Sequence, residues 1–166
     1  MSQYSIRLYG DPVLKQRASE VTDIDGTLVR LTDGMIETMY EARGLGVAAP
    51  QVGVQKRIFV YDLNDGSGAK VIVNPEISEA AGEWTYEEGC LSIPGLYWPI
   101  TRPKEVHLRG LDLDGNQISI EADELLARMF QHELDHLDGT LLLERLDGDQ
   151  RKQALRDLRS RMLTQP

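Results

Sequence analysis

Cysteine is nearly absent from this sequence, as are the usual signals for export or membrane insertion. Cys90 is the single cysteine among 166 residues, which excludes an internal disulfide and is typical of a reducing compartment. No run of about 18 apolar residues is present, so we expect no membrane span. Residues 1–12 lack the basic and apolar regions of a secretory signal. We therefore expect a cytoplasmic protein.

Positive charge is also scarce over most of the chain. The formal net charge is −9, which argues against a membrane partner and against general or sequence-specific binding of nucleic acid. One stretch, residues 151–162, is an exception with a local charge of +4. Its single acid is Asp157, and its basic residues are Arg151, Lys152, Arg156, Arg159 and Arg161.

Repeats, linkers and low-complexity tracts are missing too, so residues 1–166 predict one domain. Apolar residues at helical spacing predict helices over about 27–43, 123–138 and 149–163. β-rich runs predict strands over 57–63, 69–77, 83–90, 104–111 and 116–122, the last two forming a hairpin around Asp114-Gly115. The predicted fold class is α+β, with mixed, mainly antiparallel strands around a central buried helix, and a C-terminal helix.

The central helix contains the sequence QHELDH, residues 131–136. At about 100° per residue, His132 and His136 lie roughly 40° apart, so both imidazoles point the same way. The helix has much apolar surface and should be buried, and a buried imidazole pair needs hydrogen-bond partners or a metal. The motif H-E-x-x-H places two imidazoles on one divalent metal, with Glu133 as general base. The competing interpretation is a core helix whose histidines only pack.

A catalytic metal usually has a third protein ligand. The third histidine of one large protease class would fall on Leu142, and Glu144 is too close to serve as a ligand from a following helix. His107 alternates within a predicted strand and is expected at the surface. Cys90 is the best remaining soft ligand, although a lone cysteine often only packs as a small apolar residue.

Three motifs together resemble the bacterial-type peptide deformylases: GLGVAAPQ (44–51), EGCLSIPG (88–95) and QHELDH, in that order and at similar distances. The segment YGDPVLKQRA (9–18) is similar as well. The resemblance implies an enzyme that removes the formyl group from the N-terminal formylmethionine of nascent proteins. It also implies one divalent metal held by Cys90, His132 and His136, commonly Fe²⁺, with Ni²⁺, Co²⁺ or Zn²⁺ able to substitute.

The same resemblance assigns roles to further residues. The Gln51 side-chain amide and the Leu91 backbone N–H would stabilise the oxyanion, and Gly46 would contact the main chain of the substrate, which lies like an added strand. Leu125 and Met129 share the helix face of the two histidines. They either line a pocket for the methionine side chain or pack in the core. Some members have an arginine after EGCLSIP, where this chain has Tyr97 and Trp98, which either form an aromatic wall or pack in the core.

The C-terminal helix, predicted over residues 149–163, separates apolar and basic residues. Leu155, Leu158 and Met162 form a stripe that should pack on the domain, and Lys152, Arg156 and Arg159 should line an exposed face. The resemblance implies that this face docks on the ribosome. The competing interpretation is an ordinary solvated charged face.

Two other functions fit parts of the sequence. One is a different H-E-x-x-H metallo-amidase or peptidase, and the other is a non-catalytic ribosome-binding protein on the same fold. A non-catalytic copy would be expected to have lost Glu133, Cys90 or Gln51, and all three are present.

Overall fold

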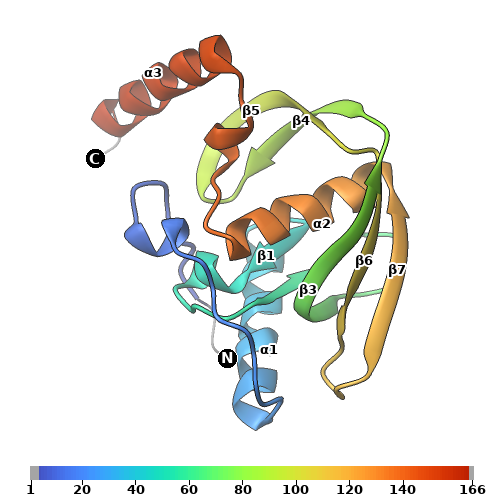
Figure 1. Cartoon of the computed structure of the whole chain (residues 1–166). Helices are drawn as coiled ribbons and strands as arrows, with labels where there is room; N and C mark the ends of the chain where they lie inside the picture. The colour runs from blue at the N-terminus through green and yellow to red at the C-terminus, as the bar shows by residue number, and fades with distance from the viewer. Residues whose placement is uncertain (1–3, 165–166) are drawn as a thin grey trace.

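The computed structural model describes residues 4–164, and its helices and antiparallel sheets confirm the predicted α+β class. Figure 1 shows the arrangement of the elements, and in the text η denotes a short 3-10 helix. They are η1 (Pro12–Lys15), α1 (Gly26–Glu41), β1 (Gly46–Ala48), η2 (Ala49–Val52), β2 (Ile58–Tyr61), β3 (Lys70–Ala81), β4 (Trp84–Cys90), β5 (Ile93–Arg102), β6 (Glu105–Leu111), β7 (Gln117–Asp123), α2 (Glu124–Leu137), η3 (Leu142–Arg145) and α3 (Gly148–Thr164).

The strands form two sheets. A five-stranded sheet has the order β1-β2-β3-β6-β7, and β4 and β5 form a separate hairpin. Every pairing between these named strands is antiparallel. β6 and β7 form the predicted hairpin, with Gly115 at φ 83° in its loop. β1 pairs only with β2 among the described strands, so one edge of the larger sheet is open.

The larger sheet has a helix on each face. Alternate residues of β2 point to opposite faces, as strand geometry requires. Phe59 and Tyr61 belong to a core cluster that includes α2, whereas Ile58 and Val60 belong to a cluster that includes α1. The ring of Phe130, from α2, lies 5.3 Å from that of Tyr61, centroid to centroid. This packing fixes α2 between the larger sheet and the β4–β5 hairpin (Figure 1).

A third apolar cluster joins the hairpin to the C-terminal segment. Its buried members are Ile93, Trp98, Ile100, Leu142, Leu143, Leu146, Ala154 and Leu158. Trp98 is thus a core residue, while Tyr97 is 64% exposed. Arg161 donates hydrogen bonds to the carbonyls of Pro94 and Gly95 near the start of β5.

Two strands were missed by the sequence analysis. β1 has only three residues, too few for an alternating pattern. β5 contains Pro94, Pro99 and Gly95, which normally indicate a turn. Among the described strands, β5 pairs with β4 alone. The prolines are tolerated because the other edge of β5 needs no backbone donors from these positions.

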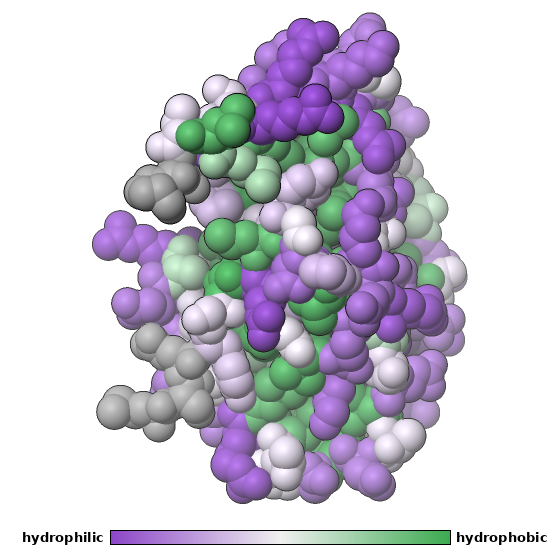
Figure 2. All heavy atoms as spheres, turned by 90° about the vertical axis from the view of Figure 1, so that its left-hand side faces the viewer, coloured by the Kyte–Doolittle hydropathy of each residue, from purple (hydrophilic) through white to green (hydrophobic). Residues whose placement is uncertain are grey.

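The prediction that Met162 packs on the domain is wrong. Leu158 is buried and Leu155 is partly buried, but Met162 is 62% exposed and Leu163 is 87% exposed. The last turn of α3 therefore leaves apolar side chains at the surface, whereas Leu158 and Ala154, one and two turns before Met162, are buried. Hydrophilic residues of α3 dominate the top of the face in Figure 2.

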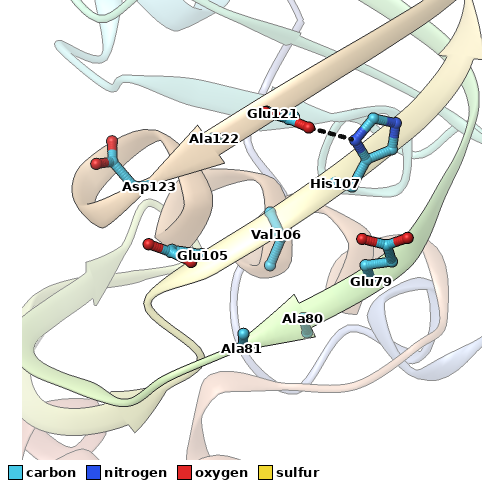
Figure 3. A pocket seen from close by; sticks show the side chains of 9 residues that line it. All are labelled: Glu79, Ala80, Ala81, Glu105, Val106, His107, Glu121, Ala122 and Asp123. Carbon is cyan, nitrogen blue, oxygen red and sulfur yellow. Dashed lines mark ion pairs between the residues drawn. The ribbon is translucent and has the colours of Figure 1, made fainter.

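Residues at the ends of β3, β6 and β7 line an open surface depression of about 800 Å³, and most of them are acidic or small (Figure 3). His107 lies here, with Nε2 2.6 Å from the hydroxyl of Ser119. Its partial exposure agrees with the prediction that it is a strand residue near the surface. Among residues 4–164, no helix has the length and apolar character to cross a membrane.

Candidate metal centre

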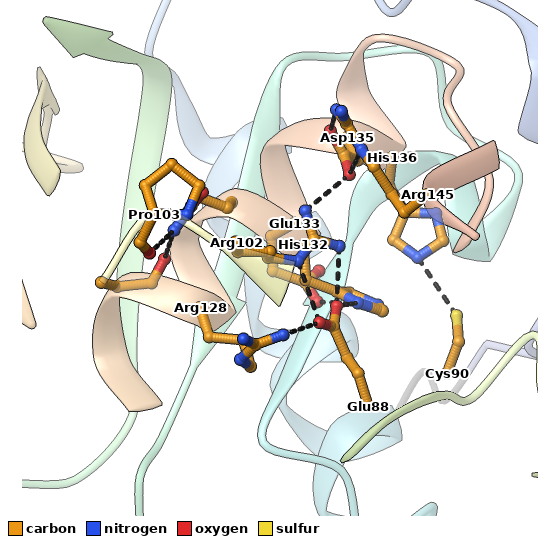
Figure 4. Close-up of polar contacts among 12 residues, drawn as sticks. Glu88, Cys90, Arg102, Pro103, Arg128, His132, Glu133, Asp135, His136 and Arg145 are labelled. Carbon is orange, nitrogen blue, oxygen red and sulfur yellow. Dashed lines mark hydrogen bonds and ion pairs between the residues drawn. The ribbon is translucent and has the colours of Figure 1, made fainter. Parts of the chain in front are cut away.

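Cys90, His132 and His136 bring three metal-binding atoms together from two elements. Cys90 ends β4, and the histidines lie one turn apart on α2. One donor atom from each residue lies within 4.8 Å of the others. The Sγ of Cys90 is 3.2 Å from Nε2 of His136, as Figure 4 shows. The structure thus assembles the three residues that the family resemblance implied.

Charge and hydrogen bonding at this site suit a divalent cation. Burial alone would raise the pKa of the Cys90 thiol, but His136 and His132 lower it well below its usual value. The thiolate is the form of cysteine that binds metal. The Nδ1 of His132 is 2.6 Å from Oε1 of Glu88. Since a carboxylate only accepts, Nδ1 carries the hydrogen and Nε2 is left to bind a cation.

Two buried polar atoms beside these ligands accept or donate no hydrogen bond within the described chain: Oε2 of Glu133 and Nδ1 of His136. An unmatched buried carboxylate oxygen is costly unless it faces a polar ligand or water. Cysteine with two histidines also leaves one tetrahedral position open. The unmatched oxygen and the open position together fit a metal centre that acts on a bound molecule.

Glu133 lies against the first strand of the sheet. Its Oε1 is 4.0 Å from Nε2 of His132, and a Cβ on Gly46 would be 3.1 Å from the same oxygen. Gly46 therefore allows β1 to approach the carboxylate closely. Burial raises the pKa of Glu133, although His132 and His136 oppose the shift. A raised pKa suits a carboxylate that takes up and returns a proton.

Gln51 is buried next to the metal ligands. Ala48 N–H donates to its Oε1 at 3.1 Å, which fixes the amide orientation. Its Nε2 donates to the Ser92 hydroxyl at 3.1 Å and lies 3.7 Å from Sγ of Cys90. Leu91 follows Cys90 directly, and its side chain packs against Gly44. The two predicted oxyanion donors thus flank Cys90.

A buried ionic network behind the ligands was not predicted. Glu88 is at its centre. The Glu88 carboxylate accepts hydrogen bonds from Nε and Nη2 of Arg102 at 2.9 and 2.7 Å, and from Nη1 of Arg128 at 2.6 Å. Burial would raise the pKa of Glu88, but the hydrogen bonds from His132 and Arg102 lower it below its ordinary range. Glu88 is therefore ionised and holds the ring of His132 in place (Figure 4).

Two charged residues of α2, Arg128 and Asp135, belong to the same network. Both are buried, and their charges pair with Glu88 and Arg102 in the interior. The one sequence signal for this network was Glu88. It lies two residues before Cys90 in a predicted strand, so the two side chains point to the same face.

The two residues predicted to lie on the ligand face of α2 differ in exposure. Met129 is buried in the core cluster with Phe59 and Tyr61, as expected both of a core residue and of the wall of an apolar pocket. Leu125, one turn earlier, is 38% exposed.

Comparisons with known proteins agree with this site. The family model described as "Polypeptide deformylase" matches residues 3–152. A peptide deformylase of Agathobacter rectalis is 52% identical over 89% of this chain and 92% of its own length, and one of Hydrogenovibrio crunogenus is 43% identical over 99% and 98%. The crystal structure of a peptide deformylase from Legionella pneumophila has a TM-score of 0.91 at 39% identity, covering 99% of this chain and 100% of that one.

A solved complex is similar too. Peptide deformylase from Ehrlichia chaffeensis in complex with actinonin has a TM-score of 0.90 at 38% identity, covering 97% of this chain and 98% of that one. With these similarities, the resemblance inferred from the three motifs is confirmed.

Removing the thiolate tests the ligand set. Cys90→Ala leaves two protein ligands where catalytic sites generally use three, so we expect loss of tight metal binding and of hydrolysis together. Metal analysis after dialysis measures the first and formate release the second. His107→Ala removes a histidine outside the site and should keep both. A metal content in Cys90→Ala equal to that of His107→Ala would contradict the assignment.

Proposed function

The chain belongs to the polypeptide deformylase family, and from this premise we propose the residues by which it removes the formyl group of N-terminal formylmethionine. It is a metal-dependent hydrolase, and the other H-E-x-x-H hydrolases and the non-catalytic alternative are not favoured. The proposal depends on one observation: the convergence of Cys90, His132 and His136 beside the buried carboxylate of Glu133.

Cys90, His132 and His136 would hold the metal. When bound there, the metal would act as a Lewis acid, lowering the pKa of a water molecule and polarising the formyl carbonyl. The ionised Glu88 keeps Nδ1 of His132 protonated and so presents Nε2 to the cation.

Glu133 moves the proton. Its carboxylate takes a proton from water while the water oxygen bonds to the formyl carbon. The proton then passes to the amine nitrogen as the carbon–nitrogen bond breaks, releasing formate and a free N-terminus. Because burial raises the pKa of Glu133, the group is suited to both transfers.

Gln51 and Leu91 would stabilise the negative charge that develops on the formyl oxygen. The Gln51 amide already has its Oε1 fixed by Ala48 N–H, so Nε2 is oriented before the substrate arrives. The Leu91 N–H is the second donor by family resemblance. Preorganised donors of this kind add to the rate because they need no rearrangement during the reaction.

The open edge of β1 supports binding of the substrate as an added strand. Gly46 lies on this edge, next to Glu133, and would contact the substrate main chain. Leu125 and Met129 would form apolar walls for the methionine side chain, with the exposed Leu125 at the mouth. Since main-chain contacts are independent of side chains, residues after the methionine should have little influence.

Glu133→Gln separates chemistry from metal binding. The amide cannot accept a proton, so turnover should fall at least about a hundredfold while metal content stays at the parent value. Formate release and metal analysis measure the two effects. Glu87→Gln, an exposed neighbour of the site on β4, should resemble the parent. A Glu133→Gln variant within about tenfold of the parent would show that another group is the base.

We propose Fe²⁺ as the native metal, as is common in the family, with Ni²⁺, Co²⁺ or Zn²⁺ able to replace it. Cysteine with two histidines accepts all four ions. The iron form should lose activity in air, because Fe²⁺ and the Cys90 thiolate are both oxidisable, and the nickel form should last longer. Activity followed over hours in air and under argon measures the difference. Equal decay of iron and nickel forms in air would contradict the proposal.

The basic face of α3 supports docking on the ribosome, in the cytoplasm where formylated chains are made. Lys152, Arg156 and Arg159 are all exposed on one helix of an otherwise acidic protein. Such a face would orient the protein toward RNA phosphates and turn the acidic remainder away. The exposed Met162 and Leu163 add an apolar contact at the end of the same helix.

Charge reversal tests the docking face. Replacing Lys152, Arg156 and Arg159 with glutamate should weaken ribosome association, and hydrolysis of a short formyl peptide should stay unchanged. The same change at the exposed Lys15, Lys70 and Lys104 alters net charge equally on other faces and serves as the control. Co-sedimentation with ribosomes at low salt measures binding, which should fall as salt rises. Equal sedimentation of the two triple variants would leave α3 as a solvated face.

A further inference from the structure

A continuous chain of charged contacts leads from the metal centre to the surface. It starts at Nδ1 of His132, passes through Glu88, and continues into the guanidinium of Arg102. Arg102 uses Nε and Nη2 for Glu88, and its Nη1 donates to Oδ2 of Asp135 at 3.0 Å. Glu88 and Arg102 are buried, with side-chain exposures of 7% and 4%, and His132 is largely covered at 12%.

Arg145 forms the outer end of this chain. Its Nε donates to Oδ2 of Asp135 at 2.9 Å, and its Nη2 donates to Oδ1 at 2.5 Å. The ion pair is bidentate. The Asp135 side chain is 12% exposed, and that of Arg145 is 47% exposed. Asp135 is therefore shared between a buried arginine on β5 and a half-exposed arginine on η3.

Arg145 lies where the C-terminal segment packs on the elements that carry the metal ligands. η3 precedes α3, and both pack on the β4–β5 hairpin through Leu142, Leu146 and Leu158. That hairpin contributes Glu88 and Cys90, and α2 contributes Asp135 and the histidines. Arg145 is thus the residue through which the C-terminal segment reaches the charged groups behind the metal ligands.

We propose that Arg145 is a positioning residue for the metal centre, acting through Asp135, Arg102 and Glu88 on the ring of His132. Arg102 is held between two carboxylates. With Arg145 in place, Asp135 has a second cation, and Arg102 keeps both Nε and Nη2 on Glu88. Without Arg145, Asp135 attracts Arg102 more strongly. The hydrogen bonds from Arg102 to Glu88 then weaken, and the ring of His132 is held less firmly in its orientation. This inference rests on the proposed ligand set.

The competing explanation is a surface ion pair that contributes little beyond local stability. Arg145→Gln and Arg145→Lys distinguish the two, with Arg151→Gln as a control at an exposed arginine of the same segment. Cobalt-loaded protein is the probe, because its absorption spectrum reports ligand geometry. Direct partners of metal-binding histidines typically contribute 10- to 100-fold to affinity or activity, so a more distant partner should contribute about three- to tenfold.

For Arg145→Gln we expect weaker Co²⁺ binding by that factor, an altered cobalt spectrum and a lower kcat with nearly unchanged KM. Arg145→Lys keeps the charge but loses the bidentate geometry. Its Co²⁺ affinity and kcat should therefore fall between those of the parent and of Arg145→Gln. If Arg145→Gln matches Arg151→Gln in cobalt affinity and spectrum, and differs only in melting temperature, the positioning role is wrong.

A double-mutant cycle tests the route. If Arg145 acts through Glu88, the effect of Arg145→Gln on cobalt affinity should largely disappear in a Glu88→Gln background. An undiminished effect would overturn the proposal. Should Glu88→Gln not fold, Asp135→Asn takes its place in the cycle with the same two outcomes. Loss of metal in Cys90→Ala with no effect of Arg145→Gln would reject this inference alone, whereas metal retained in Cys90→Ala would reject the ligand set.

Discussion

Glu88 places an ionised carboxylate in the interior, between the β4–β5 hairpin and α2, and much of the site depends on how that charge is matched. Two guanidinium groups and one imidazole surround it, from Arg102 on β5 and from Arg128 and His132 on α2. A buried charge is tolerated only when it is paired and hydrogen bonded, and removal of one partner typically costs about 3–5 kcal/mol. The same contacts therefore join the hairpin to the helix and orient a metal ligand.

The architecture separates support from substrate access. The hairpin and α2 supply the three ligands and the ionic network behind them, whereas β1 and η2 supply Gly46 and Gln51 on the open side. Gly46 has no side chain to block the approach to Glu133, and one edge of β1 pairs with no other strand of residues 4–164. One side of the centre is thus rigid and charged, and the other presents backbone groups that a peptide can pair with.

Sequence reasoning located the centre because its signals are local. The histidine spacing on a helix predicts a shared face without knowledge of the fold, and the three motifs together indicate the family. The ionic network was missed because burial of Arg128, Asp135 and Arg102 depends on partners distant in the chain. β5 was missed because its prolines indicate a turn unless the strand is known to be at an edge, and Met162 was misplaced because apolar spacing cannot show where the packing surface ends.

The most direct test of the account is formate release measured against metal bound per chain. Metal-free protein is titrated with Fe²⁺ under argon, and hydrolysis of a short formylmethionyl peptide is followed at each addition. The account predicts no activity without metal and a linear rise that stops at one ion per chain. Full activity in the metal-free protein, or no formate at full metal loading, would contradict it.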